Sequence, residues 1–428
     1  TGGLIARSFD HIGQAFVVLE KDELRVEELD LLDFKTDTPA LAADARLPDN
    51  LRLAGLCHAK CRGVLAVTND DEANLAIAIA VRLLNPGIPV IARAEQKSVA
   101  ANMASFGTDH IINPYERFAD SLALAVAAPE RFRLIELLTS LPETPLAEPH
   151  QPPHGHWILC GYGRFGHAVA ERLRNTGIRL TIIDPAAGDA DHDIIGDGTE
   201  ASTLRQAGIS EARGIVAGSN NDINNLSIAV TAHELNPELF VVARQNQAAN
   251  NALFAAYGAD FTVLPSRVIA QECIALLTAP LLARFLDRVQ QLDETQCRHL
   301  VERLQAACAG LTPVVWDNRL NAAEAPASWQ ALMHGRTIEL GSLLADAADR
   351  QRRLPVVPLL VERGTDYLLL PADDFTLQAG DQLLFASPLA AQRELELTLR
   401  NANELDYVLT GNDHSGSLLG KLLAGRSA

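Results

Sequence analysis

Residues 157–166 read Trp157-Ile158-Leu159-Cys160-Gly161-Tyr162-Gly163-Arg164-Phe165-Gly166, an apolar run that leads directly into a complete GxGxxG sequence. Residues 165–176 then show helical apolar spacing, and Gly177 is placed to end that helix. Residues 180–183 form a second apolar run, which ends at Asp184. This order of strand, turn, helix and strand is the context in which GxGxxG indicates a Rossmann-like βαβ unit.

The three glycines and the acid have separate chemical roles in such a unit. Gly161, Gly163 and Gly166 let backbone N–H groups approach phosphate oxygens at a helix N-terminus, and Asp184 can accept hydrogen bonds from ribose hydroxyls. An acid here disfavours a 2′-phosphate, so we expect NAD or an unmodified adenine nucleotide (AMP, ADP or ATP) rather than NADP. The alternative is a Rossmann lobe that keeps its glycines only for the packing of helix and strand.

The chain contains two copies of this lobe. Gly2 aligns with Gly166 and Glu20 with Asp184, and residues 74–93 share ten of twenty positions with the aligned residues of the second copy, 225–244. Such agreement indicates duplication rather than chance periodicity. Apolar runs that alternate with helical patterns predict parallel sheets with helices on both faces. The expected strands include residues 64–67, 90–92, 215–217 and 240–243.

The first copy shows only the last glycine of its fingerprint. Its missing strand and first two glycines are therefore expected upstream of Thr1, and the intact loop at 161–166 is the expected ligand site. The candidate ligand contacts of the first copy are the aligned residues Gly2, Glu20, Asp44, Thr68 and Arg93.

Composition narrows the class of protein. At 428 residues the chain should form two or three domains, and Lys+Arg 36 against Asp+Glu 54 gives a net charge of -18. Such a surface repels nucleic acids and anionic lipid headgroups. The six cysteines are scattered along the chain, which indicates reduced thiols rather than a disulfide framework. No apolar run approaches the roughly 18 residues that are needed to cross a bilayer.

The predicted domains are α/β throughout. We expect a first Rossmann-like lobe (1–140), a proline-rich linker (141–156), a second Rossmann-like lobe (157–285), a helical connection (286–334), a small α/β C-terminal lobe (335–400) and a tail (401–428). The linker is assigned because it contains five prolines. In the C-terminal lobe, apolar runs on both sides of a turn at 363–366 predict a β-hairpin.

Several motifs together resemble the RCK family, also called KTN, the cytoplasmic regulators of potassium channels and transporters. The matching pieces are residues 160–166, Gly196-Asp197-Gly198-Thr199, Thr68-Asn69-Asp70-Asp71 with Ser219-Asn220-Asn221-Asp222, the Ala-Arg pairs that end at Arg93 and Arg244, and Leu377-x-x-Gly-Asp-x-Leu. The resemblance covers residues 1 to about 285 and a smaller C-terminal piece.

Further candidate contacts in the second lobe each have a structural alternative. Asp197, Gly198 and Thr199 lie where RCK relatives contact the adenine end, or they stabilise their own loop. Ser219 and Asn220 end a strand on the expected ligand side, as phosphate or nicotinamide contacts. The remaining cofactor-binding candidates of this lobe are Arg164 and Phe165, within the glycine loop, and Arg244, at the end of a strand. Arg244 and Arg93 supply either a cation for that ligand or a structural salt bridge.

The resemblance implies a ligand-sensing gating module at the cytoplasmic face of the inner membrane, attached to a potassium pore upstream of Thr1. It also implies homo-oligomers, with four chains forming an eight-lobe ring. The alternatives are a soluble nucleotide-binding subunit of a potassium transporter and an NAD-dependent dehydrogenase; no catalytic residue is identifiable for the dehydrogenase, so no enzyme activity is expected. Some relatives bind a divalent cation such as calcium, but no EF-hand spacing appears and no metal ligand can be assigned.

Overall fold

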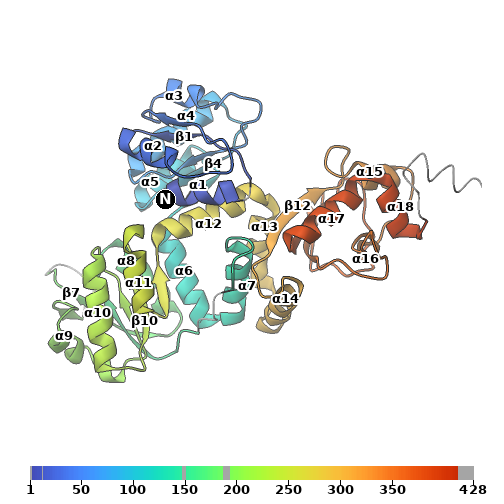
Figure 1. Ribbon diagram of the computed structural model, residues 1–428. Helices are drawn as coiled ribbons and strands as arrows, with labels where there is room; N and C mark the ends of the chain where they lie inside the picture. Colours follow the sequence, from blue (N-terminus) through green and yellow to red (C-terminus); the bar gives the residue numbers. More distant parts are fainter. Residues whose placement is uncertain (1, 12, 147–150, 187–192, 413–428) are drawn as a thin grey trace, which may run out of the picture. The chain divides into compact units, whose positions relative to one another are not determined.

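The structure is a computed structural model that describes residues 2–11, 13–146, 151–186 and 193–412 (Figure 1). The chain forms two compact units. Unit 1 comprises Thr1–Phe132 and Glu148–Leu277 and contains both Rossmann-like lobes, whereas unit 2 comprises Arg133–Ala147 and Thr278–Ala428. Each unit is described by itself below.

The second lobe of unit 1 is a six-stranded sheet in the order β11-β10-β9-β6-β7-β8, with every pair parallel. Strand β6 lies where the strand order reverses, which is where α/β sheets place their ligand crevice. The elements are β6 (His156–Cys160), α8 (Arg164–Asn175), β7 (Arg179–Asp184), β8 (Ile194–Ile195), α9 (Ala201–Gln206), β9 (Gly214–Ala217), α10 (Asp222–Leu235), β10 (Phe240–Arg244), α11 (Asn251–Tyr257) and β11 (Phe261–Val263), with 3-10 turns at Ile209–Glu211 and Ala248–Asn250.

Apolar strands covered by helices on both faces explain this sheet. All five residues of β6 are buried, as are all four of β9, so these strands show no polar face. Helix α8 buries Phe165, Val169 and Leu173 against one face of the sheet. The opposite face packs on the apolar side of α10, with Ile228 in that core. The predicted doubly wound α/β fold is confirmed in this lobe.

The first lobe repeats the pattern as two smaller sheets, β1-β2 and β3-β4-β5, each with parallel pairs. Among the described residues of this lobe, no strand joins β1 to β3 in the way that β6 joins β7 to β9. The elements are α1 (Gly2–His11), β1 (Val18–Glu20), α2 (Glu23–Asp30), β2 (Ala40–Ala42), α3 (Pro48–Leu53), β3 (Val64–Ala66), α4 (Asp71–Leu84), β4 (Val90–Arg93), α5 (Lys97–Ser105) and β5 (His110–Ile112).

The two lobes exchange their last helices. Helix α6 (Pro114–Ala127) follows β5 of the first lobe but packs in the core of the second, where Phe118 stacks on Phe165 with ring centroids 5.5 Å apart. Helix α12 (Pro265–Thr278) follows β11 of the second lobe but buries Ile269 and Cys273 in the core of the first. The predicted boundaries at 1–140 and 157–285 therefore need correction, because each lobe's last helix completes the other's core.

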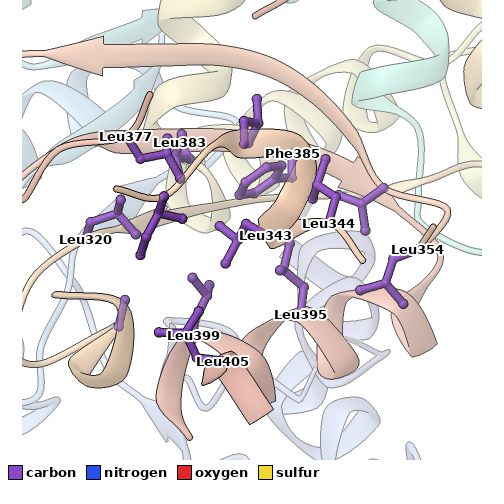
Figure 2. Close-up of a cluster of buried hydrophobic side chains, with 14 of the residues drawn as sticks. Leu320, Leu343, Leu344, Leu354, Leu377, Leu383, Phe385, Leu395, Leu399 and Leu405 are labelled. Carbon is purple, nitrogen blue, oxygen red and sulfur yellow. The ribbon is translucent and has the colours of Figure 1, made fainter. Parts of the chain in front are cut away.

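Unit 2 contains an antiparallel sheet in the order β12-β15-β13-β14 with one shared core, drawn in Figure 2. The predicted hairpin is confirmed, since β13 and β14 pair across a turn at Gly364, which has a φ of +62°. The elements are α13 (Pro280–Arg288), a 3-10 turn (Val289–Gln291), α14 (Glu294–Ala307), β12 (Val314–Arg319), α15 (Pro326–Met333), α16 (Leu340–Leu343), β13 (Val357–Arg363), β14 (Asp366–Leu369), β15 (Gln382–Ser387), α17 (Leu389–Arg400) and α18 (Ala402–Thr410). Helix α7 (Pro129–Thr139) runs across the boundary between the two units.

Three predicted boundaries differ from the structure of unit 2. The expected helical connection 286–334 contains β12, which pairs with β15 along its whole length. The expected tail begins with α18, whose Leu405 and Val408 are buried. The expected linker pairs with the segment after α14, since Pro145 bridges Leu311 and Thr312 donates its hydroxyl to the Leu141 carbonyl at 2.6 Å. Each contact joins residues distant in sequence, which local composition does not encode.

The aspartate of the Leu-x-x-Gly-Asp-x-Leu pattern has a structural role. Asp381 is buried and accepts two hydrogen bonds of 2.7 Å from Arg363, at the end of β13, and one of 2.8 Å from the Gln378 backbone N–H. The pattern thus ties the hairpin to the strand that follows it.

Within the described segments, no single helix has the length and apolar character that a bilayer crossing requires, although one bent pair, Pro265–Leu277 with Leu281–Gln291, meets the criteria of length and composition.

Candidate functional site

The GxGxxG loop connects β6 to α8, and packing requires two of its glycines. Gly161 has a φ of +98°, and a Cβ there would lie 3.2 Å from the Ser219 nitrogen. A Cβ on Gly166 would lie 2.0 Å from the Gly161 carbonyl oxygen, so only glycine fits. Gly163, the N-cap residue of α8, has a φ of −73° and no atom within 4 Å of an added Cβ. Packing therefore explains Gly161 and Gly166 but not Gly163, which faces open space at the helix N-terminus.

Gly163 also lines a pocket of about 290 Å³. The pocket lies at the carboxyl ends of β6, β7, β9 and β10, which is the place that the strand order indicates. Its volume is near the lower end of the usual range for small-molecule sites. The lining residues are Cys160, Gly161, Gly163, Ile183, Asp184, Pro185, Asp197, Gly198, Gly218, Ser219, Asn220, Asn224, Ile228 and Arg244.

Asp184 ends β7 and holds the loop in place. One carboxylate oxygen accepts the Tyr162 backbone N–H at 2.6 Å, and the other accepts the Ala186 N–H at 2.8 Å. Each carboxylate oxygen can accept a further hydrogen bond. Asp184 is only half-buried and lines the pocket, so it can still receive a hydroxyl from a ligand.

The Asp197 loop shows features of both interpretations of these residues. Asp197 accepts the Thr199 N–H at 2.9 Å and so stabilises its own turn, while Asp197 and Gly198 also line the pocket. Thr199 is not among the lining residues. Gly198 is required because a Cβ would lie 2.8 Å from the Cys160 sulfur. Burial, reinforced by the charge of Asp197, raises the pKa of Cys160 to about 12, so this thiol stays protonated and is no nucleophile at neutral pH.

Arg244 is the cation of the site. Its side chain is buried, and its guanidinium donates 2.9 Å to the Asn220 side-chain oxygen and 3.2 Å to the Tyr115 hydroxyl. The guanidinium carbon lies 4.9 Å from the ring centroid of Tyr115 and 5.0 Å from that of Phe165. Its Nε has no hydrogen-bond partner, and burial lowers the pKa of Arg244. Among the described residues no acidic side chain pairs with Arg244, so the predicted structural salt bridge is wrong for this residue.

The other second-lobe candidates stand beside Arg244. Asn220 accepts from it and lines the pocket. The Ser219 hydroxyl is used locally, since it donates to the Asn221 carbonyl at 3.1 Å, while the Ser219 backbone is held by the buried Asn225. Arg164 points out of the lobe toward Glu95, 3.0 Å away, and is not a lining residue.

The first lobe places its candidates in two groups. Glu20 and Asp44 lie at the ends of β1 and β2 in one sheet, whereas Thr68 and Arg93 lie at the ends of β3 and β4 in the other. Asp44 is engaged by Arg46, whose hydrogen bonds lower the pKa of that carboxyl to about 2. Gly2, in helix α1, has no atom within 4 Å of an added Cβ.

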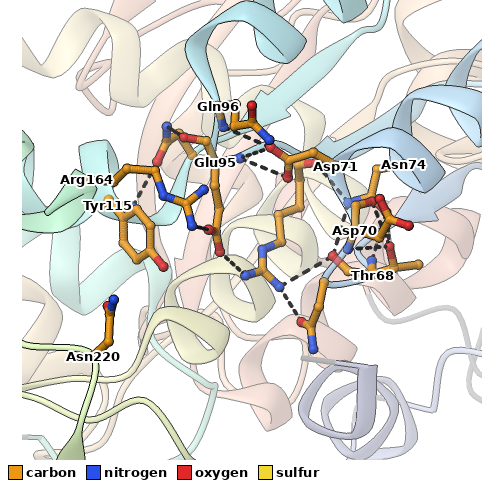
Figure 3. A network of polar contacts seen from close by, with 12 residues as sticks. Thr68, Asp70, Asp71, Asn74, Glu95, Gln96, Tyr115, Arg164 and Asn220 are labelled. Carbon is orange, nitrogen blue, oxygen red and sulfur yellow. Dashed lines mark hydrogen bonds and ion pairs between the residues drawn. The ribbon is translucent and has the colours of Figure 1, made fainter.

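Arg93 follows the salt-bridge alternative. It pairs with Glu95 and donates 2.6 Å to the Asn69 side-chain oxygen. Thr68 donates its N–H and its hydroxyl to Asn74, at 2.9 and 2.8 Å (Figure 3). The two arginines that the sequence treats as equivalent therefore have different partners.

Sequence reasoning missed residues that only the fold brings to the site. Tyr115 reaches Arg244 because α6 crosses to the second lobe, and no pattern around Tyr115 indicates this. Gly218, Asn224 and Ile228 line the pocket from the turn after β9 and from α10. The repeated Asn225 carried a signal, namely its identity with Asn74, and both are fully buried.

A metal site finds no support in the described part of the chain, where no three His, Cys, Asp or Glu side chains are grouped so as to hold an ion. The expectation of a calcium site is therefore not carried further.

Two Rossmann-like lobes with a crevice at the switch point of the complete sheet define the class of this protein. Residues 1–114 and 157–265, more than half of the chain, match the TrkA-N domain, and the chain belongs to that family. The resemblance to RCK regulators seen in the sequence is thereby confirmed, and the two matched segments correspond to the two copies.

Several of the curated relatives are named as potassium channel or potassium transport proteins. Potassium channel protein 1 of Methanocaldococcus jannaschii is 29% identical over 150 residues, 33% of this chain and 45% of that protein. The Trk system potassium uptake protein TrkA homolog of Methanothermobacter thermautotrophicus is 31% identical over 135 residues, 29% of this chain and 62% of that protein. The chain thus spans less than two thirds of the length of either relative.

Among solved structures, the GsuK RCK domain has a TM-score of 0.51 at 19% identity and covers 92% of this chain and 93% of its own. The GsuK channel bound to NAD has a TM-score of 0.53 at 17% identity and covers 93% of this chain and 77% of its own. These likenesses show the fold alone.

Proposed function

We propose that this chain is a ligand-sensing regulatory module that binds NAD or an adenine nucleotide in the second lobe and controls potassium flux through a membrane pore. The observation that carries the proposal is the pocket at the end of β6, where the N-terminus of α8, Asp184 and the buried cation Arg244 converge. The helix terminus and Arg244 suit phosphates, and Asp184 suits a ribose diol.

The residues fit such a ligand on structural grounds. The Nε atoms of Arg244 and Arg93 are both buried without a hydrogen-bond partner, although buried polar groups are normally hydrogen-bonded; what distinguishes Arg244 is that it lines the pocket. Gly163 leaves the space over the first turn of α8 open. When bound, the nucleotide would supply an anion in direct contact with Arg244, on which the acids of the described protein, Glu95 and Asp222, act only at longer range.

The contact of Arg244 with α6, the helix that crosses from the first lobe into the second, gives the site a means of signalling. Arg244 lines the pocket and also donates to the hydroxyl of Tyr115, which stands at the start of α6 and so directly after β5 of the first lobe. A phosphate that attracts Arg244 competes with this hydrogen bond. Ligand binding then changes the relative stability of lobe arrangements, which is the requirement for a ligand-driven conformational change.

A glycine substitution tests the site without disturbing the fold. Gly163→Asp places a carboxylate in the open space where the phosphate is expected, and an acid at an N-cap position is favourable for the helix. In titration calorimetry with ADP and NAD, we expect at least a tenfold loss of affinity, because two like charges would meet. Thermal stability should be unchanged or slightly higher.

The matched control is Gly87→Asp, which adds the same charge at an exposed glycine of the first lobe that also has no atom within 4 Å of an added Cβ. It should bind as the unaltered protein does. If the unaltered protein binds neither NAD nor ADP, or if Gly163→Asp binds as the control does, the ligand site is elsewhere or absent.

The partner that we propose is a potassium pore, with the module at the cytoplasmic face of the membrane and four chains supplying an eight-lobe ring. The potassium channel relative supports this proposal. Potassium flux through vesicles that carry the full-length protein, measured with and without NAD or ADP, tests it, and ligand-independent flux would contradict it. Light scattering of the purified chain tests the tetramer.

A subunit of a potassium transporter is the second candidate, favoured by the TrkA homolog that is 31% identical over 135 residues. Co-purification with a separate membrane subunit rather than a covalently linked pore would support it. We propose no catalytic role, and no general acid or base has been identified at the pocket; turnover of NAD with any small substrate would overturn this.

A further inference from the structure

A single acidic side chain distinguishes the arginine sites of the two lobes. Glu95 follows the last residue of β4 by two positions, and its carboxylate pairs with Arg93 and, at 3.0 Å, with Arg164. Figure 3 shows Glu95 between the polar network of the first lobe and Arg164 with Tyr115. The Glu95 side chain is only 12% exposed, so its charge acts in a largely desolvated setting.

The second lobe has the same backbone framework with an amide in place of this acid. Alignment by 151 residues places Asn246 opposite Glu95 and Asp222 opposite Asp71. Asp71 accepts the backbone N–H of Glu95 at 2.9 Å, and Asp222 accepts that of Asn246 at 2.6 Å. The two segments are thus held alike, and only the side chain differs.

The side-chain amide of Asn246 donates to groups that belong to neither Arg244 nor its partner Asn220. It donates 2.8 Å to Asp222 and 3.3 Å to the Ser219 carbonyl. Arg93 and Arg244 share one kind of neighbour, because each donates to the asparagine that follows the adjacent strand, Asn69 or Asn220, but Arg244 also donates to the Tyr115 hydroxyl. Arg93 therefore pairs directly with an acid of its own lobe, whereas in the described protein no acidic side chain forms an ion pair with Arg244, on which Glu95 and Asp222 act only at longer range. A buried charge without compensation is costly.

We propose that Glu95 is an internal counter-anion, which takes beside Arg93 the place that a ligand phosphate takes beside Arg244. The difference between Glu95 and Asn246 then restricts phosphate binding to the second lobe. The claim that a phosphate binds beside Arg244 rests on the proposed function. The claim that Glu95 is the counter-anion of Arg93 rests only on the contacts of Glu95.

The first test transfers the acid to the second lobe. Asn246→Glu should place a carboxylate beside Arg244, as in the first lobe, and Asn246→Gln is the uncharged control of equal length. In titration calorimetry with ADP, we expect Asn246→Glu to bind at least tenfold more weakly than Asn246→Gln, because the carboxylate competes with phosphate for Arg244. Equal affinities in two folded variants would overturn the proposal.

The second test removes the acid from the first lobe. Glu95→Ala leaves Arg93 without a counter-charge and opens the space of a carboxylate, whereas Glu95→Gln fills that space with a neutral amide. In sodium chloride, we expect Glu95→Ala to have a lower Tm than the unaltered protein. In sodium phosphate of equal ionic strength, the Tm of Glu95→Ala should rise by more than that of the unaltered protein, whose rise measures the general effect of phosphate. Glu95→Gln should show only the general effect. The same phosphate response in all three proteins would overturn the proposal.

The two tests separate this inference from the proposed function. If the unaltered protein binds no nucleotide, the proposed function fails, and the phosphate response of Glu95→Ala still decides whether Glu95 acts as a counter-anion.

Discussion

Asn225 connects the fold of the second lobe to its candidate site, and its removal should have a measurable cost. Its side chain is fully buried on the first turns of α10 and makes three hydrogen bonds with neighbouring backbone. The amide oxygen accepts the Ser219 N–H at 2.8 Å, and the amide nitrogen donates to the carbonyls of Ser219 and Arg244 at 3.0 and 2.7 Å. One side chain thus fixes the ends of β9 and β10, where the pocket lies.

Asn225→Ala removes all three bonds and strands buried backbone groups. At about 1 kcal/mol per hydrogen bond the loss is about 3 kcal/mol, somewhat more if no water replaces the amide. For a unit of this size that corresponds to a fall in Tm of about 6–12 °C. Because this loss is smaller than the total stability of a typical domain, about 5–15 kcal/mol, the variant should still fold.

The assay is equilibrium unfolding in urea, followed by far-UV circular dichroism, beside thermal denaturation. Asn224→Ala is the matched control, since the neighbouring residue lies on the same helix, is exposed and lines the pocket. It should lose no stability, because surface substitutions usually change it by less than about 0.5 kcal/mol. A loss below about 1 kcal/mol for Asn225→Ala would refute the reasoning, because the amide would then not be holding the two strand ends.

Two further predictions concern the loop and the buried thiol. Gly166→Ala should prevent folding or lower Tm by more than 10 °C, because its Cβ would lie 2.0 Å from the Gly161 carbonyl oxygen, while Gly163→Ala should leave Tm within about 2 °C; thermal scans of both variants check this. Iodoacetamide at pH 8 should alkylate the exposed Cys57 and spare Cys160 in the native protein, because burial raises the pKa of Cys160 to about 12 and keeps it protonated. Peptide mass spectrometry resolves the two sites, and rapid modification of native Cys160 would contradict its assigned burial.

Much of the second lobe follows from local sequence. The apolar run at 157–160, the glycines, and an acid at the end of the next strand specify their elements through periodicity and turn geometry. Asp184 was identified in this way, and its two backbone hydrogen bonds show why the chain needs an acid there, whatever ligand it also meets. Arg93 and Arg244 could be aligned. Glu95 lies only two residues after Arg93 and was within reach of sequence reasoning, whereas Tyr115 reaches Arg244 only through a tertiary contact.

The boundaries show the same limit. The run Val314–Arg319 is a strand only because β15 offers it an antiparallel partner some seventy residues later, and strand pairing of this kind depends on context rather than on propensity.

By itself, then, the sequence determined that the chain holds two copies of a βαβ lobe, where the phosphate-type loop lies, and which residues end the strands around it, because these features depend on neighbours a few residues apart. Only the tertiary structure decided that α6 and α12 change lobes, that Tyr115 meets Arg244, and that Glu95 also pairs with Arg164. The physical reason is that an amphipathic helix encodes which face it buries but not which core receives it. That choice depends on the summed burial and charge pairing of segments distant in sequence.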